Sequence, residues 1–305
     1  MFRHILLPLD GSALAESVLP PAAYLAQILR AKITLIHIVE KNGNPTVHGE
    51  RHLTGYAEAE EYLLEVRQKA FLPTESVGLH VHESALKDVA RGIVEHQDEL
   101  TPDLVMMCSH GRGGLRDLLF GSIAQQVISL GRTPVFLVRP EKATGKHDFI
   151  CRNLLAPTDG RADHEIGLVT AAGLSNATKA GLRLMAVAPT VGTLAGRNAA
   201  AGRFLPGATH AMLDMLEGEL QSYLGKMLKR FESEGITVST VVSRGDPASL
   251  IAEMADTADI DLIIFATHGK AGTKAFWSHS VGAMVLAQTS RPVLLVPVAN
   301  AAIGG

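Results

Sequence analysis

The chain lacks the features that define disulfide-rich, membrane-spanning or nucleic-acid-binding proteins. Its 305 residues include two cysteines, Cys108 and Cys151, outside any CxxC spacing, so we expect neither a disulfide framework nor a structural zinc site. No apolar run approaches the roughly 20 residues needed to cross a bilayer, and the N-terminus lacks a signal-peptide layout. The net charge of −3 gives no attraction to nucleic acid or anionic membranes. We therefore expect a soluble, cytoplasmic protein with neither nucleic acid nor membrane as a partner.

What the chain does contain is apolar residues and a long internal repeat. Apolar residues make up 47% of it and charged residues 19%, which predicts a well-packed globular protein. The repeated segments are 5–11 with 153–160, 103–111 with 261–269, and 133–139 with 291–297. The offset grows from 149 at Asp10 and Asp159 to 158 at His110 and His268, a net insertion of nine residues that we place within 191–209. A repeat of this length predicts two domains, 1–141 and 151–305, with a polar linker at 142–150.

Strand and helix patterns alternate along each repeat. In the first half we predict strands at 3–12, 32–39, 77–82, 103–107 and 132–138, and helices at 14–29, 56–71, 85–99 and after 121. We expect Ser12 to cap the first helix, Pro20-Pro21 to bend it, and 41–55 to form a loop. Such alternation predicts an α/β fold in which each domain is a mostly parallel five-stranded sheet with helices on both faces. Ligands of these folds bind at the carboxyl ends of the strands.

A glycine-containing turn follows the apolar strand predicted at 103–107. The segment Met107-Cys108-Ser109-His110-Gly111 is followed, after nine residues, by Gly121-Ser122 at the start of a predicted helix. A glycine at a strand end lets backbone amides approach a ligand closely. A Gly-Ser pair at a helix start offers free N–H groups, a hydroxyl and the positive end of the helix dipole, all suited to phosphate. The pattern predicts an anion-binding cradle.

With these residues assembled, the chain resembles the universal stress protein family in its tandem form. The resemblance covers about 2–298 and implies two Rossmann-like (adenine nucleotide α-hydrolase-like) domains. Nucleotide-binding members carry G-x-x-G, nine residues and G-[S/T], with an aspartate after the first strand. The first domain matches at His110-Gly111, Gly121-Ser122 and Asp10, and departs where Cys108 replaces the first glycine.

The resemblance implies that the first domain binds ATP, or ADP or AMP, with Mg²⁺ as an optional companion. Asp10 and the Ile38 backbone would contact adenine, and Met107 and Cys108 would lie beside the base and ribose. Glycine and helix-start residues would hold the phosphates. The full predicted set is Pro8, Asp10, Ile38, Met107, Cys108, His110, Gly111, Arg112, Gly121, Ser122 and Ile123.

The second domain departs further from the family pattern. Ala266 replaces the first glycine, Gly269 is kept, and His279-Ser280 stands where Gly-Ser is expected. A histidine at that turn would crowd the phosphate path, so we predict a degenerate second site in a mainly structural or regulatory domain. Its candidate residues are Asp159, Ala266, Gly269, His279 and Ser280.

Several single residues allow two interpretations. Asp10 either contacts the ligand or caps its own turn, and Arg112 either reaches a phosphate or is solvated. His80 and His82 lie on one side of a predicted strand, but with no third ligand in view we interpret them as surface histidines and predict no metal site.

Enzyme motifs are missing as well. Neither a P-loop nor a G-x-S-x-G elbow occurs, and the turn at 10–13 lacks the Ser-Gly-Gly-rich loop of ATP-splitting relatives. We predict no catalytic residues and a stress-response protein that acts as a ligand-dependent regulatory or interaction module. The alternatives are an interaction module without nucleotide binding, favoured by Cys108, Ala266 and His279, and a slow ATPase. The resemblance also implies that strands 135–138 and 293–296 pair the domains into an internal pseudo-dimer, and that two chains can form a homodimer.

Overall fold

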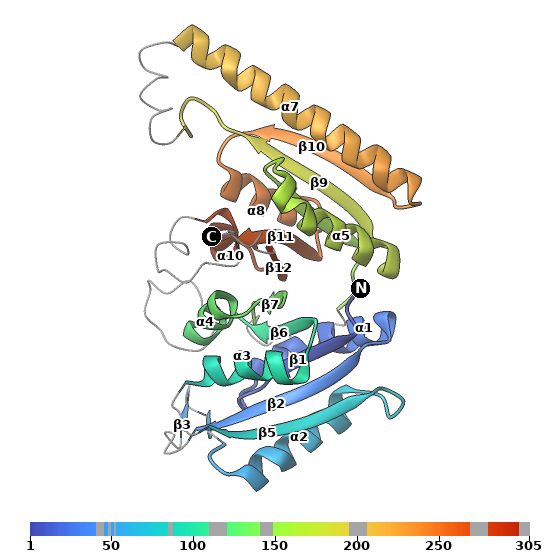
Figure 1. Cartoon of the computed structure of the whole chain (residues 1–305), viewed down its shortest axis with the longest axis vertical. Coiled ribbons are helices and arrows are strands. Elements are labelled where there is room, and N and C mark those ends of the chain that lie inside the picture. The colour runs from blue at the N-terminus through green and yellow to red at the C-terminus, as the bar shows by residue number, and fades with distance from the viewer. Residues whose placement is uncertain are drawn as a thin grey trace, which may run out of the picture. The chain divides into compact units, whose positions relative to one another are not determined.

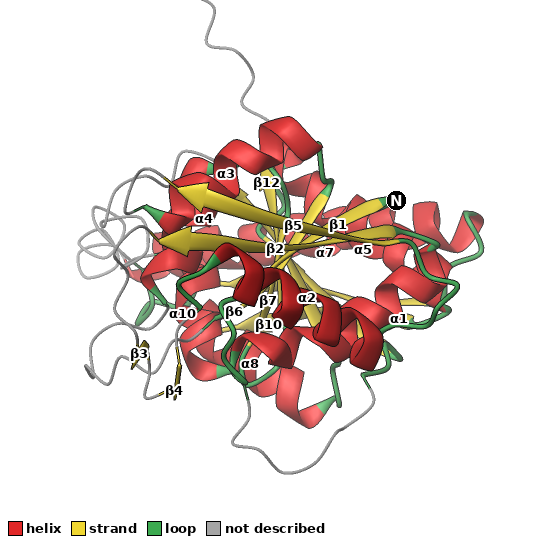
Figure 2. Ribbon diagram, turned by 90° about the horizontal axis from the view of Figure 1, so that it is seen from below, coloured by secondary structure: helices red, strands yellow, loops and turns green. Residues whose placement is uncertain are grey.

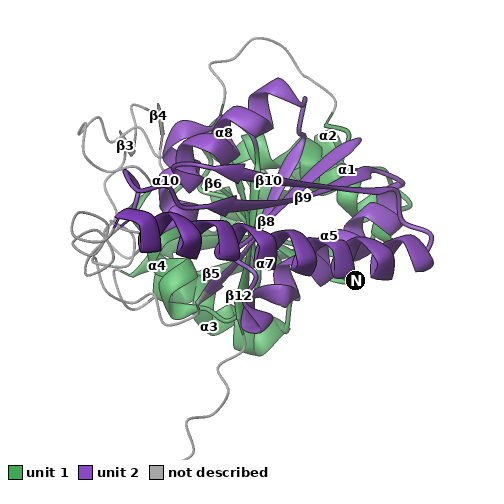
Figure 3. Ribbon diagram, turned by 90° about the horizontal axis from the view of Figure 1, so that it is seen from above, with its two compact units in different colours: residues 1–150, 268–277, 292–305 green, residues 151–267, 278–291 purple. Residues whose placement is uncertain are grey.

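The computed structural model describes residues 1–40, 46–47, 50–51, 53–84, 88–109, 121–140, 149–194, 206–268 and 280–298 (Figure 1). Its contacts divide the chain into two compact units, which Figure 3 colours separately. Unit 1 comprises Met1–Ile150, His268–Trp277 and Pro292–Gly305, and unit 2 comprises Cys151–Thr267 and Ser278–Arg291. No helix in the described ranges is both long enough and apolar enough to span a membrane.

Unit 1 is a six-stranded sheet in the order β12-β7-β6-β1-β2-β5. Its pairs are parallel apart from β12 with β7. A separate antiparallel pair joins β3 to β4. The strands are β1 (His4–Pro8), β2 (Lys32–Glu40), β3 (Thr46–Val47), β4 (Glu50–Arg51), β5 (Val77–Ser84), β6 (Leu104–Cys108), β7 (Val135–Val138) and β12 (Val293–Val298). The helices are η1 (Ala15–Val18), α1 (Leu19–Leu29), α2 (Tyr56–Ala70), α3 (Val89–Leu100) and α4 (Ser122–Leu130).

Helices cover both faces of the unit 1 sheet, as predicted. Alternate residues of β5 point to opposite faces. Val81 packs against the same buried cluster as Tyr62 of α2, whereas the rings of His80 and His82 lie against His96 of α3. Figure 2 shows α2 and α3 on opposite sides of β2 and β5. Burial on both faces explains why the inner strands β1, β2, β6 and β7 are nearly continuous apolar runs, whereas β5 alternates.

Unit 2 repeats this arrangement with four parallel strands in the order β10-β9-β8-β11. The strands are β8 (Asn153–Thr158), β9 (Gly181–Ala188), β10 (Val238–Arg244) and β11 (Leu262–His268). The helices are η2 (Ala162–His164), α5 (Glu165–Thr178), α7 (Pro206–Ser233), α8 (Pro247–Thr257) and α10 (Val281–Gln288).

The last strand of the second sequence repeat belongs to unit 1. β12 runs antiparallel to β7, with Leu294 opposite Phe136. Each repeat therefore supplies five strands, but the predicted count of five strands per sheet is wrong, because the units hold six and four. The physical reason lies in β7, a four-residue strand whose outer backbone groups would otherwise form an unpaired sheet edge. β12 satisfies that edge.

The strand registers also correct the predicted insertion. Ile33 pairs with Val77 in unit 1 and Leu182 with Val238 in unit 2, so the offset rises from 182 − 33 = 149 to 238 − 77 = 161. It falls to 246 − 88 = 158 at the aspartates that cap α3 and α8. The net nine residues are therefore 161 − 149 = 12 inserted and 161 − 158 = 3 deleted. A longer helix accounts for much of the insertion, since α7 has 28 residues and α2 has 15.

The first predicted helix is divided into two parts. Residues 15–18 form the 3-10 turn η1, and α1 then begins at Leu19 with Pro20 and Pro21 in its first turn. A proline is tolerated there because the first amides of a helix have no partner within it. The prolines therefore start the α-helix instead of bending it. Ser12 caps the preceding turn, where its Oγ accepts a hydrogen bond from the Ala15 amide at 3.1 Å.

Candidate functional site

The carboxyl ends of β1, β2 and β6 meet at one edge of the unit 1 sheet. Pro8, the last residue of β1, is paired with Ile36 of β2. Leu6 is paired with Val105 of β6, so Pro8 lies level with Met107, one residue before the end of β6. Ile38 and Met107 are buried, at 5% and 6% exposure. Their side chains therefore fill the core, and what they offer a ligand is backbone. Use of the Ile38 backbone by a ligand stays a prediction.

The turn after β1 is held by its own polar groups. Asp10 Oδ1 accepts hydrogen bonds from the Ser12 amide at 2.9 Å and from Ser12 Oγ at 2.6 Å. Gly11 has a φ of +87°, which a residue with a Cβ rarely adopts, and the Leu53 side chain packs over it. The turn-capping interpretation of Asp10 is therefore correct for one carboxylate oxygen. A carboxylate has two acceptor oxygens, so capping does not preclude contact with a ligand.

The buried His37 links this turn to the segment that follows β2. Its Nδ1 lies 2.7 Å from the Leu9 carbonyl oxygen and its Nε2 lies 3.3 Å from the Leu53 carbonyl oxygen. At 2% exposure it is one of the few polar side chains in the core. His37 thus lies between the backbone of the β1 turn and that of Leu53, a placement that the sequence pattern did not reveal.

The two ends of the predicted glycine motif meet in space. The amide of Gly121 donates to the carbonyl oxygen of Ser109 at 2.7 Å, so α4 begins directly beside the end of β6. Gly121 is the N-cap, and no described side chain caps the helix there. Ser122 and Ile123 are exposed in the first turn. Uncapped amides at an exposed helix start can bind an anion.

Three residues of the first-domain prediction, His110, Gly111 and Arg112, lie outside the described residues. The others (Pro8, Asp10, Ile38, Met107, Cys108, Gly121, Ser122 and Ile123) occupy strand ends, the β1 turn or the start of α4. Cys108 is the last residue of β6 and is half-buried beside Val138 of β7.

The corresponding helix start in unit 2 is built differently. Ser280 is the N-cap of α10, and its Oγ accepts a hydrogen bond from the Ala283 amide at 3.2 Å. Ser280 therefore hydrogen-bonds one of the free amides at the start of α10. Its equivalent in unit 1, Ser122, is the first residue of α4 and does not cap that helix. The turn after β8 has different partners, because Asp159 Oδ1 accepts from the Arg161 amide at 3.1 Å and lies 2.8 Å from His164 Nδ1. Gly269 and His279 lie outside the described residues.

Ala266 lies against a helix in unit 2. A Cβ added to Gly167 of α5 would lie 2.8 Å from the Ala266 backbone nitrogen, too close for any real contact. Only glycine allows α5 to approach this end of β11. Ala266, which replaces the first glycine of the family pattern, is therefore tightly packed on the side that faces α5.

Each unit places a tyrosine beside the turn that follows its first strand. Tyr62 of α2 and Tyr223 of α7 occupy equivalent positions, because they differ by 161 residues, as do β5 and β10 that follow them. Glu16 and Glu165 are equivalent at the offset of 149 that applies to the first strands. Burial, with the charge of Glu16, raises the pKa of Tyr62 well above its usual range. Burial, with the charge of Glu165, raises that of Tyr223 to about 12. Sequence analysis missed these pairs, although recurrence at the local offset could have revealed them.

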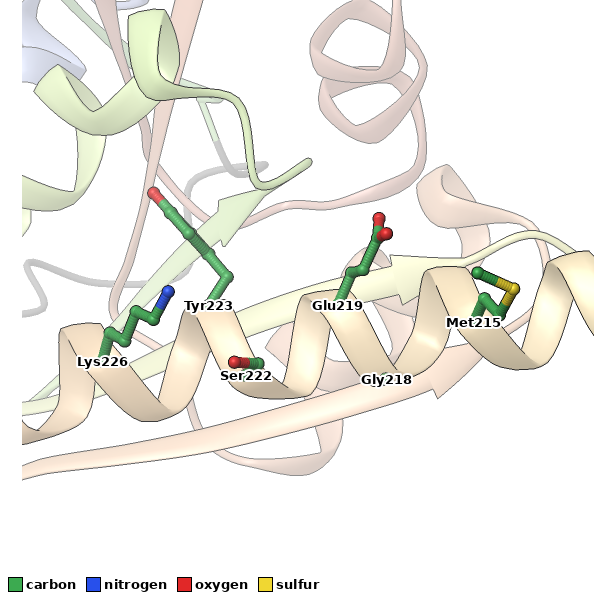
Figure 4. Close-up of a pocket in the computed structure, with 6 residues that line it drawn as sticks. All are labelled: Met215, Gly218, Glu219, Ser222, Tyr223 and Lys226. Carbon is green, nitrogen blue, oxygen red and sulfur yellow. The ribbon is translucent and has the colours of Figure 1, made fainter.

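His80 and His82 are not the free surface histidines that we expected. Both are half-buried on β5, and their rings lie 4.6 and 4.5 Å, centroid to centroid, from the buried His96 of α3. Sequence spacing could not supply this third histidine because it lies on another element. The described part of unit 2 contains a separate groove of about 500 Å³ along one exposed face of α7 (Figure 4). Its lining residues are Met215, Gly218, Glu219, Ser222, Tyr223 and Lys226, none of them in either predicted nucleotide site.

Comparison with known proteins settles the family. The Universal stress protein family profile matches the chain twice, at residues 1–139 and 151–297. The chain belongs to the universal stress protein family. It is 25% identical over 306 residues to a universal stress protein of Mycolicibacterium smegmatis, an alignment that covers 96% of each chain. It is 30% identical over 149 residues to Universal stress protein MJ0531 of Methanocaldococcus jannaschii, which covers 47% of this chain and 85% of that protein.

A solved structure gives the same fold over nearly the whole chain. A universal stress protein from Archaeoglobus fulgidus superposes with a TM-score of 0.67 at 18% identity, covering 97% of both chains. The α/β fold and the tandem form expected from the resemblance are thus confirmed. At this identity the superposition establishes the fold alone.

Proposed function

We propose that this universal stress protein binds ATP or a related adenine nucleotide, mainly in its first domain, residues 1–141. The observation that carries the proposal is the hydrogen bond between Gly121 and Ser109, which holds the uncapped start of α4 beside the end of β6. In unit 2 the equivalent helix start is capped by Ser280. The remaining domain bounds that we propose are a linker at 142–150 and a second domain at 151–305.

In this proposal the ligand is held chiefly by backbone groups. The amides of Ser122 and Ile123, at the positive end of the α4 dipole, bind phosphate. Asp10, the Ile38 backbone and the strand end at Met107 and Cys108 bind the adenosine part. Pro8, His110, Gly111, Arg112 and Gly121 complete the proposed site. Mg²⁺, where present, accompanies the phosphates.

The proposed output is a ligand-dependent change in shape or partner affinity rather than product formation. The two domains form an intrachain pair through their last strands, supported by the antiparallel pairing of β7 with β12, and two chains form a homodimer in the cytoplasm. We expect phosphate release from ATP to be negligible over a long incubation. Sustained release that depends on enzyme concentration would favour the slow-ATPase alternative.

Two substitutions at Gly121 test the site. Its φ of −56° is open to any residue, so Gly121→Asp and Gly121→Asn can both be accommodated without backbone strain, and both side chains are good helix caps. The two differ in charge alone. Calorimetry with ATP, ADP, AMP and cyclic AMP should show the Asp variant binding at least about tenfold more weakly than the Asn variant, a difference of about 1.4 kcal/mol.

The same titrations can contradict the proposal. If the native protein binds none of the four nucleotides, the proposed nucleotide-binding function is wrong. That result would favour an interaction module without nucleotide binding. Equal affinity of the native protein and Gly121→Asp would move the site out of the first domain. The corresponding control in the second domain is Ser280→Ala, which should leave nucleotide affinity unchanged.

A further inference from the structure

Three histidines of unit 1 come together from two elements. His80 and His82 lie on β5, and His96 lies on α3. One ligand nitrogen from each lies within 4.8 Å of those from the other two, the one such group of metal-binding side chains among the described residues. Tetrahedral Zn²⁺ with bonds of about 2.05 Å needs ligand nitrogens about 3.4 Å apart. Small side-chain rotations would close the observed spacing.

The fold determines this arrangement. Residues 80 and 82 are two apart on a strand, so their side chains leave β5 on the same face. α3 packs on that face against β2 and β5, and its buried side includes Ala90, Ile93 and His96. His96 is 2% exposed, so it is held in the core at the point where the two β5 histidines reach the helix.

The hydrogen bonds of His96 prepare it as a ligand. Its Nδ1 lies 2.7 Å from the carbonyl oxygen of Gly92, an acceptor, so this nitrogen carries the proton and donates it. The other nitrogen, Nε2, is then the unprotonated atom that can coordinate a metal. Metal-binding histidines usually donate their second ring N–H to a carbonyl or carboxylate in this way.

His80 has a buried ring nitrogen with an unmet requirement. Its Nε2 is shielded from solvent and finds no hydrogen-bond partner in the described parts of the chain. A buried polar atom left unpaired costs free energy, so native structures rarely keep one without a purpose. Coordination of a metal ion by Nε2 would meet this requirement.

A carboxylate stands at the edge of the group. Glu99 Oε2 lies 3.7 Å from His96 Nε2, one turn further along α3. It is well exposed and can rotate toward an ion as a fourth ligand or hold a bound water. Three imidazoles with a carboxylate or water suit Zn²⁺ and neighbouring divalent transition metals rather than Ca²⁺ or Mg²⁺, which prefer oxygen ligands.

We propose that His80, His82 and His96 bind a divalent transition-metal ion of the Zn²⁺ class, with Glu99 as a supporting carboxylate. The ion ties strand β5 to helix α3. The site is confined to unit 1, because the equivalent positions in unit 2 are Val241, Ser243 and Met254. It shares no residue with the proposed nucleotide site, although His82 of β5 is paired with Ile38 of β2.

Zinc binding can be measured directly on the whole chain. The protein, freed of any histidine tag and stripped with a chelator, is titrated with ZnCl₂ by calorimetry, and with Co²⁺ to observe the visible spectrum of nitrogen coordination. We expect one ion per chain and a higher thermal unfolding midpoint with Zn²⁺, since an ion that binds only the folded state stabilises it.

Histidine variants locate the site. His82→Gln and His96→Gln should each weaken binding at least about 100-fold, because even outer partners of metal ligands contribute 10–100-fold. His210→Gln, which changes an exposed histidine of α7, should bind like the native chain. If buried His96→Gln does not fold, as judged by circular dichroism, His82→Gln alone decides the result.

Two outcomes would overturn the metal site. The first is that the native chain takes up none of Zn²⁺, Co²⁺ or Ni²⁺. The second is that a folded His82→Gln variant binds as tightly as the native chain, which would assign the ion to another place. Neither outcome depends on whether the protein binds a nucleotide.

Discussion

The two repeats keep the same turn after their first strand and differ in what they could bind. Asp10 and Asp159 each accept a hydrogen bond from the amide two residues on, and Gly11 and Gly160 both have positive φ. A buried tyrosine approaches each turn. In contrast, the helix start after the fourth strand is uncapped in the first repeat and capped by Ser280 in the second.

The difference separates two kinds of interaction. Contacts that hold the backbone conformation of the turn after the first strand recur in both repeats. They lie within the turn or between the turn and the helix that covers it. The uncapped start of α4 and the histidine cluster of unit 1 each occur once. Unit 2 keeps the same frame, and at the start of α10 the Ala283 amide is hydrogen-bonded by Ser280. We therefore expect features shared by the repeats to contribute equally to stability, and unshared features to contribute unequally.

The largest effect is expected at an aspartate that both repeats use alike. The Asp103 carboxylate accepts from the amides of Arg3 and His4, and that of Asp261 accepts from the amides of Arg152 and Asn153. Asp103→Ala and Asp261→Ala should each lower the free energy of unfolding by about 2–3 kcal/mol, because hydrogen bonds to a charged acceptor are lost. Urea unfolding measures both. Unequal losses of unfolding free energy would show that the two equivalent aspartates do not stabilise their repeats equally.

A smaller effect is expected where only unit 2 requires glycine. Gly167→Ala places a methyl group against the Ala266 backbone and should cost about 1–3 kcal/mol, the usual range for overpacking. The equivalent residue of unit 1 is the buried Val18, so that unit already accommodates a side chain there. Gly218→Ala, on an exposed face of α7 with open space around it, is the control and should be neutral or stabilising. A neutral Gly167→Ala would mean that α5 can move away from β11.

The serines at the two helix starts provide a matched pair. Ser280→Ala removes the cap of α10 and should lower the free energy of unfolding by about 1 kcal/mol. Ser122→Ala, at the equivalent position, removes no cap and should change stability by less than about 0.5 kcal/mol. Equal costs in urea unfolding would contradict the contrast between the two helix starts.

Sequence analysis identified the elements better than their partners. Hydrophobic runs bounded by turn residues located β1, β2, β5, β6 and β7 of the first repeat, and the Gly121-Ser122 pair located the start of α4. The short pair of β3 and β4 was missed, because 41–55 was predicted to be a loop. Periodicity says nothing about which strand pairs with β7, because that choice depends on the unsatisfied backbone of a short edge. The pairing of β7 with β12 was instead expected from the family resemblance, which implied that strands 135–138 and 293–296 pair the domains.

The functional residues that the sequence missed depend on tertiary contact. His96 lies 14 residues after His82, and only the packing of α3 on β5 brings their rings together. His37 is one polar residue in an otherwise apolar strand, and its two carbonyl partners come from separate segments. The family site residues were placed by resemblance, and their role in binding stays a prediction.

The smallest effect concerns the paired tyrosines at high pH. A raised pKa in the folded state means that the neutral hydroxyl is favoured there, so this contribution is present below the unfolded pKa of about 10 and lost as pH rises through the folded value. For Tyr223 that window runs from about 10 to about 12. Absorbance titration should show Tyr62 and Tyr223 ionising late, above the usual pKa of a tyrosine. Tyr223→Phe should remove one late step and make stability fall less steeply between pH 10 and 12. Loss of an early step instead would mean that Tyr223 is open to solvent and that the resemblance between the two turns ends at the backbone.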